Sequence, residues 1–322
     1  MTDAPSPAHR IAAVDVARGA ALVAMVLYHG CWDLTYAGLA RFDLFGDLLW
    51  LAARDIILGA FLVLAGAGLT LAARGSVGWR RAASRIAVIA AAALAVTVAS
   101  GWFAPDAVIF FGVLHHIALA SLLGLGFLRL PGGVVLAAAA ACLVAPGVLA
   151  GPAFDSEWLS WLGLMSHEPR SNDYVPLLPW FALVLTGMVA ARRLEALPVL
   201  AGWVPRAAAL RGLARAGRYS LAVYLVHQPL LLGAVWLVAA ALGGGTAGGA
   251  ATTPAHFMGE CRAACERTGA SAPSCVAHCR CVDAGFAERG LWPLFLKQRL
   301  DDDGQRLVAE VVQSCVARGA GR

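Results

Sequence analysis

The chain has 322 residues, of which 60% are hydrophobic and only 14% are charged. Soluble globular domains carry about 25% charged residues, so this composition excludes an ordinary soluble protein and indicates that lipid is the solvent for much of the chain. The formal net charge is +5. The arginines cluster at the ends of apolar segments rather than along one face, which argues against a nucleic-acid partner.

Seven apolar segments follow one another in chain order, each long enough to cross a bilayer as a helix of about 20 residues. A backbone in lipid must satisfy its own hydrogen bonds, which favours helices. We therefore predict an all-α transmembrane bundle followed by a small helical tail. The predicted spans are residues 11–32, 52–73, 83–103, 107–128, 132–151, 175–192 and 219–242. The first span is expected to be retained, because it holds Asp15 and Arg18 and lacks a convincing cleavage site.

Arginines follow the second, fourth and sixth spans, which places them on one side of the membrane. By the positive-inside rule that side is cytoplasmic. We expect a multi-pass protein of the bacterial inner membrane with a cytoplasmic N-terminus and a periplasmic C-terminus. Composition divides the chain into a transmembrane domain, a flexible Gly/Ala/Thr linker and a cysteine-rich tail, at residues 1–243, 244–253 and 254–322.

Six of the eight cysteines lie in the tail. Two pairs have the i, i+4 spacing that places both side chains on one helical face. Two such helices in a hairpin would be joined by two disulfides, which we predict to be Cys261–Cys279 and Cys265–Cys275. This leaves Cys281 to pair with Cys315. Spacing alone leaves about 15 connectivities open. A zinc or iron–sulfur site is the alternative, which a periplasmic tail disfavours, and we expect no metal.

Titratable side chains inside spans are costly and therefore candidates for function. In the first span Asp15, Arg18, His29 and Asp33 are separated by 3, 11 and 4 residues, which at about 100° per residue keeps them in one stripe facing the bundle interior. The alternative for Asp15 and Arg18 is a local i, i+3 ion pair, and the alternative for the other two is a hydrated helix end.

The fourth and seventh spans add further polar groups. His115 and His116 are adjacent near the middle of the fourth span, so only one of them faces a shared pocket squarely. In the seventh span Ser220, Tyr224 and His227 share one face, and Gln228 lies beside them. Histidines hydrogen-bonded across helices for packing are the alternative. Imidazole can abstract a proton or carry an acyl group, so His29, His116 and His227 are the candidate catalytic residues.

Four segments carry a resemblance to a known family. They are RIAAVDVARGAAL at residues 10–22, FGVLHHIA at 111–118, DYVPLLPWF at 173–181 and GRYSLAVYLVHQP at 217–229. Their order and spacing resemble the bacterial DUF1624 branch of the heparan-alpha-glucosaminide N-acetyltransferase catalytic-domain family, over residues 10 to about 235. The tail has no counterpart in this resemblance.

The resemblance implies an enzyme that moves acetyl from cytoplasmic acetyl-CoA, as co-substrate, to a sugar or amino-sugar acceptor on the periplasmic side. The active histidine of lysosomal members lies in a His-x-x-Trp segment, whose nearest analogue here runs from His29 to Trp32. Asp55 aligns with an aspartate of the second span, and Asp173 belongs to the third matching segment. Arginine suits phosphate because its planar fork donates two hydrogen bonds, so Arg18 and Arg218 are expected to hold the coenzyme phosphates.

Two other functions fit the same polar groups. In a transporter or flippase the stripe would line a pathway, although no internal repeat is evident. In a non-catalytic membrane scaffold the tail would bind a partner. Beyond the lipid bilayer, acyl-CoA and the acceptor, a homodimer is an open alternative to a monomer.

Overall fold

The computed structural model describes residues 11–40, 42–44, 47–73, 78–167, 169, 171–195 and 202–241 of the predicted bundle, and residues 257–258, 261–262, 264–265, 271–292, 295 and 302–319 of the tail. These residues form helices and loops, with no strand among them. They fall into two compact units, one from residues 1–30 and 43–230 and the other from 31–42 and 231–322. The domain boundary at residue 243 stays a prediction.

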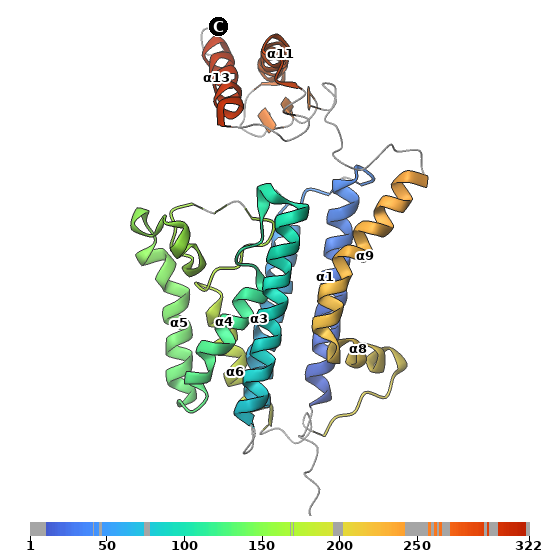
Figure 1. The fold of residues 1–322 in the computed structure, drawn as a ribbon, viewed down its shortest axis with the longest axis vertical. Coiled ribbons are helices and arrows are strands. Elements are labelled where there is room, and N and C mark those ends of the chain that lie inside the picture. Colours follow the sequence, from blue (N-terminus) through green and yellow to red (C-terminus); the bar gives the residue numbers. More distant parts are fainter. Residues whose placement is uncertain are drawn as a thin grey trace, which may run out of the picture. The chain divides into compact units, whose positions relative to one another are not determined.

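Each of the seven predicted spans contains a helix (Figure 1). Among the described residues, five helices are long and apolar enough to cross a membrane: α1 (Ala12–Tyr36), α2 (Leu48–Ala72), α3 (Gly78–Phe103), α5 (Gly132–Leu149) and α9 (Ser220–Ala241). The other two are shorter: α4 (Val113–Gly124), which η2 (Leu125–Phe127) extends, and α6 (Phe181–Glu195). The all-α membrane fold is confirmed.

The helices α4 and α6 begin later than the sequence predicted, at Val113 and Phe181 rather than at residues 107 and 175. The segments before them are irregular and bond to one another. The Val175 N–H donates to Phe111 O at 3.0 Å, and the Asn172 N–H donates to Ala107 O at 3.2 Å. Irregular backbone is tolerated within a membrane protein where the protein itself satisfies its hydrogen bonds.

The centre of the bundle is the contact between α2 and α6, where two glycines allow the backbones to touch. A Cβ on Gly66 would lie 1.9 Å from Val184 O, and a Cβ on Gly187 would lie 2.0 Å from Val63 O. Both distances are below any that a side chain can adopt, so neither position accepts alanine without separating the helices. Small residues at such contacts are how helices associate in lipid, where burial of apolar surface gives no gain.

Aromatic side chains at both ends of α3 mark the two membrane surfaces. Trp79 is 65% exposed at one end, and Trp102 and Phe103 are 81% and 87% exposed at the other. The rise of about 1.5 Å per residue separates the two tryptophans by about 35 Å, which matches a hydrocarbon core of about 30 Å between its interfaces. Tryptophan is enriched at these interfaces because its ring is amphipathic.

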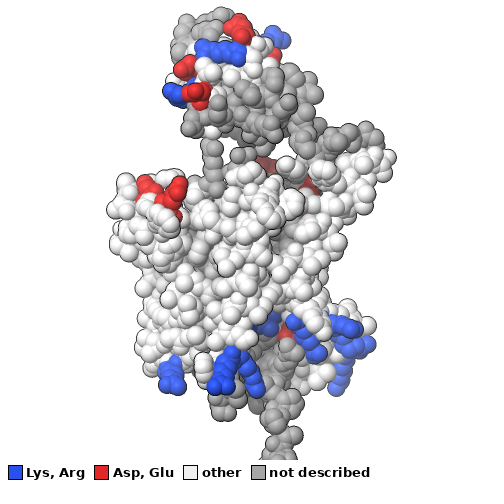
Figure 2. All heavy atoms as spheres, in the orientation of Figure 1, with Lys and Arg blue, Asp and Glu red and all other residues white. Residues whose placement is uncertain are grey.

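On the face that Figure 2 shows, the basic side chains of the bundle gather at one end of its helices. This end includes the start of α3, with Arg80 and Arg81, and the end of α6, with Arg192 and Arg193. Arg192 donates to the carbonyls of Leu130, Phe127 and Leu128 at 2.6 to 3.1 Å and so closes the turn between α4 and α5. The gathering of arginines agrees with the sequence argument that they lie on one side of the membrane.

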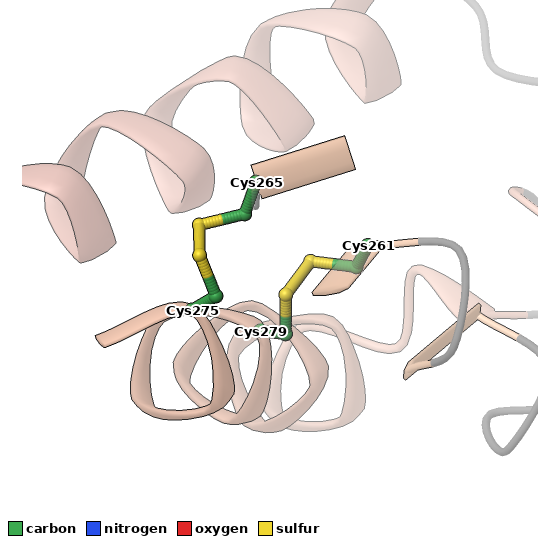
Figure 3. The surroundings of a disulfide bond; sticks show 4 residues. All are labelled: Cys261, Cys265, Cys275 and Cys279. Atoms are coloured by element: carbon green, nitrogen blue, oxygen red, sulfur yellow. A yellow bond between two sulfur atoms is a disulfide. The ribbon is translucent and has the colours of Figure 1, made fainter. Parts of the chain in front are cut away.

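The tail contains α11 (Ala272–Glu288) and α13 (Asp302–Gly319). All three predicted disulfides are confirmed: Cys261–Cys279, Cys265–Cys275 and Cys281–Cys315. Figure 3 shows the first two side by side along α11, as expected for pairs at i, i+4 spacing. The third joins α11 to α13 over a small apolar core whose buried members are Val282, Phe286, Leu291, Val311 and Cys315. The disulfides supplement a core too small to be stable unaided.

Because Cys281 and Cys315 are 34 residues apart, removing their disulfide releases a long loop in the unfolded tail. In the full chain, a Cys281→Ala/Cys315→Ala variant is expected to destabilise the tail by about 3–4 kcal/mol. Limited proteolysis under native conditions measures the change as faster cleavage within residues 257–319. Cys142→Ala, which removes a free cysteine, is the control and should leave tail cleavage unchanged. Equal cleavage of both variants would contradict the stabilising role of the Cys281–Cys315 disulfide.

Candidate functional site

The polar stripe predicted for the first span is present on α1. Asp15 and Asp33 are buried, at 3% and 1% exposure, and Arg18 and His29 are half-buried. The helix is continuous through all four residues. The stripe therefore has the pair Asp15 and Arg18 at one end and His29 toward the other. About 16 Å of helix separates Arg18 from His29.

Asp15 lies between two guanidinium groups. Arg18 Nη1 is 3.6 Å from one carboxylate oxygen, and Arg218 Nε is 3.5 Å from the other. Arg18 also donates to Leu64 O at 3.3 Å, which ties it to α2. The local i, i+3 pair considered from the sequence exists, but it is part of a larger cluster that reaches α8 (Ala208–Arg218).

Arg85 of α3 completes this cluster, and we did not predict it as a site residue. A Cβ on Gly68 would lie 2.1 Å from Arg18 Nη2 and 2.6 Å from Arg85 Nη1, so these nitrogens are less than 5 Å apart. Two like charges at this distance repel by about 3 kcal/mol at an effective dielectric constant near 20. The sequence contains Gly68 in the second span and arginines near the ends of the first and third spans. Which of these residues face one another cannot be read from a single sequence.

Three guanidinium groups gather at the arginine-rich end of the bundle. Arg18 and Arg218 each ion-pair with Asp15, and Arg85 lies beside Arg18. An anion with several oxygens, such as a phosphate, would accept the forked hydrogen bonds that arginine donates.

The histidine end pairs two helices. The rings of His29 on α1 and His227 on α9 lie with centroids 5.2 Å apart in an edge-to-face arrangement, and α1 and α9 run side by side in Figure 1. His227 Nδ1 is 2.5 Å from Tyr224 O. A carbonyl only accepts, so Nδ1 carries the proton and Nε2 has a lone pair. That Nε2 is buried and has no hydrogen-bond partner among the described residues.

The other predicted residues of α9 lie around this pair. The Tyr224 ring is 5.6 Å from His227 and 6.4 Å from Phe61 of α2, so it fills the space between helices. Gln228 is half-buried next to His227, and Ser220 is half-buried at the first residue of α9. The structure thus brings His29, His227 and Tyr224 together.

The two histidines of α4 have separate surroundings. His115 is bonded at both ring nitrogens: Nε2 is 3.0 Å from Thr97 Oγ1, and Nδ1 accepts from the Gly112 N–H at 3.3 Å. His116 is fully buried, and its Nδ1 donates to Pro176 O at 3.1 Å. Its Nε2 has no hydrogen-bond partner in the described chain. The catalytic role predicted for His116 remains a prediction.

Asp173 contacts the start of α4, and Asp55 contacts its neighbour in the chain. Asp173 Oδ2 accepts from the Val113 N–H at 2.9 Å and so caps α4, whose own N-cap residue, Gly112, has no side chain. Burial raises the pKa of the Asp173 carboxyl, and the bond from Val113 lowers it in part. Asp55 is exposed and pairs with its neighbour Arg54 at 3.0 Å. The supporting roles predicted for both aspartates remain predictions.

The site therefore has two parts, a guanidinium cluster and a histidine pair, joined by one face of α1. No group of His, Cys, Asp and Glu side chains suited to a metal ion occurs among the described residues.

Comparison with known proteins gives one match. Residues 10–229 match the family described as heparan-alpha-glucosaminide N-acetyltransferase, catalytic, and this stretch includes α1 to α6, α8 and the first half of α9. No curated protein and no solved structure matches the chain. Since the match covers more than half of the chain and every residue of both parts of the site, the chain belongs to the heparan-alpha-glucosaminide N-acetyltransferase catalytic family.

Proposed function

We propose that this membrane protein is an acetyltransferase that uses acetyl-CoA, and that one coenzyme molecule extends along α1 from the guanidinium cluster to the histidine pair. The observation that carries the proposal is this two-part arrangement. The cluster fits the coenzyme phosphates, and the uncharged histidine pair fits the thioester. The extended pantetheine arm of coenzyme A is the type of linker that bridges about 16 Å of helix.

The phosphates of the coenzyme would bind Arg18, Arg85 and Arg218. Asp15 fixes two of these side chains from opposite sides, at 3.6 and 3.5 Å, so their positions do not depend on the ligand. Preorganised donors lower the entropic cost of binding. Because the cluster lies at the arginine-rich end, the positive-inside rule makes the entry side cytoplasmic, and the acceptor would approach from the periplasmic side.

At the other end, His227 is the proposed general base. Its Nδ1–H is held by Tyr224 O, which fixes the ring and leaves Nε2 to accept the proton of an acceptor amine or hydroxyl. The acceptor atom attacks the thioester carbon, the C–S bond breaks, and the coenzyme leaves as a thiolate that takes up the proton from His227. Neutral His29 would donate a hydrogen bond to the thioester oxygen as negative charge develops there.

The acceptor class follows from the family, so a sugar or amino sugar is the proposed substrate. The tail, which the family match does not include, has no assigned part in the reaction. The inner membrane of a bacterium is the proposed location, with the N-terminus cytoplasmic and the tail periplasmic, where disulfides persist.

The role of His227 is tested by acetyl-CoA turnover. Purified full-length protein is assayed for release of the coenzyme thiol, with glucosamine or water as the probe acceptor. Removing a general base typically costs about 10²–10⁴-fold in rate, so His227→Ala should lower kcat by this factor while leaving the affinity for acetyl-CoA nearly unchanged. His29→Ala should also lower kcat.

His167→Ala is the control, because His167 is an exposed loop residue outside the site. It should keep wild-type turnover. Wild-type turnover by His227→Ala would disprove the base assignment. A protein that binds no acetyl-CoA would disprove the acetyltransferase itself and favour the transporter alternative.

The guanidinium cluster is tested by coenzyme binding. A charge-assisted hydrogen bond contributes about 1.5–3 kcal/mol, so Arg85→Gln and Arg18→Gln should each weaken coenzyme A binding about 10- to 100-fold in calorimetric titration. Arg129→Gln removes an exposed arginine in the turn that Arg192 closes and should not change the affinity. Equal affinities for wild type and Arg85→Gln would remove Arg85 from the site.

A further inference from the structure

The helix α8 holds three arginines that the coenzyme site does not explain fully. Arg211, Arg215 and Arg218 are spaced i, i+4 and i+7, which places their side chains within a stripe about 60° wide. All three are exposed. Arg218 reaches Asp15, whereas Arg211 and Arg215 have no carboxylate partner among the described residues.

The opposite side of α8 is packed tightly onto α1. Ala214 and Gly217 are buried. A Cβ on Gly217 would lie 1.9 Å from Asp15 O, and a Cβ on Gly19 would lie 2.1 Å from Leu213 O. This contact is backbone against backbone, so the helix is held at a fixed height at the arginine-rich end of the bundle. Its basic stripe is thereby held at the level of the lipid headgroups.

An apolar groove lies between α1 and the segment that leads into α8. It is lined by Ala13, Val16 and Ala17 of α1 and by Trp203, which precedes α8, and its volume is about 290 Å³. These α1 residues are on the side of the helix opposite to Asp15 and Arg18. The groove therefore faces away from the coenzyme site. The guanidinium of Arg211 bonds back to Arg206 O, close in sequence to Trp203.

From these contacts we infer that α8 and the groove bind an anionic phospholipid of the arginine-side leaflet. The lipid phosphate would lie on Arg211 and Arg215, and an acyl chain would lie in the groove against Trp203. The charge is complementary, since the cytoplasmic leaflet is anionic and each basic residue near its surface strengthens binding about fivefold. Tryptophan at the interface suits the boundary between headgroup and chain.

This inference does not depend on acetyl transfer, because neither Arg211 nor Arg215 belongs to the coenzyme site. It predicts that the protein prefers phosphatidylglycerol to phosphatidylcholine with the same chains. Delipidated full-length protein in detergent is titrated with each lipid and measured by native mass spectrometry. The Arg211→Gln/Arg215→Gln variant should bind phosphatidylglycerol about 30-fold more weakly and phosphatidylcholine unchanged.

The matched control is Arg129→Gln/Arg193→Gln, which removes two exposed arginines at the same end of the bundle but away from α8. It should keep wild-type affinity for phosphatidylglycerol, and Arg211→Lys/Arg215→Lys should keep most of it. Equal loss in both double Gln variants would overturn the inference and leave only general attraction of charge. Displacement of phosphatidylglycerol by coenzyme A would overturn it as well, by assigning the stripe to the coenzyme.

Discussion

The structure depends on how one buried carboxylate is compensated. Asp15 is 3% exposed in a protein whose solvent is largely lipid, and an isolated charge there would be strongly unfavourable. Arg18 and Arg218 each contact one of its oxygens. The Arg218 contact attaches α8 to α1, and Arg18 also reaches α2, where it lies beside Arg85. The proposed phosphate site is therefore built around the guanidinium groups that compensate Asp15.

The histidine pair shows how the same environment creates a reactive group. The Tyr224 carbonyl accepts the Nδ1–H of His227, one turn later in the same helix. This hydrogen bond sets the tautomer of His227 and leaves the lone pair of the neutral ring on Nε2. His116 Nδ1 likewise donates to a backbone carbonyl, that of Pro176, so the same kind of hydrogen bond fixes two histidines of the bundle.

Features that depend on local periodicity were predictable from the sequence. The apolar segments predicted the seven helices, and the stripe on α1 followed from about 100° per residue. The i, i+4 spacing predicted two disulfides of the tail, which left Cys281 to pair with Cys315. Features that depend on distant contacts were not. Asp173 caps α4 across 60 residues and delays its start, and the approach of Arg85 to Arg18 depends on Gly68 of a third helix.

The most direct test of the account is a cryo-EM structure of the full chain in lipid nanodiscs with acetyl-CoA bound. The account predicts that the coenzyme phosphates contact Arg18 and Arg85, that the pantetheine arm follows α1, and that the thioester lies within hydrogen-bond distance of His29 and His227. A coenzyme bound at another place, or a thioester remote from both histidines, would contradict the central claim that α1 connects the two parts of one active site.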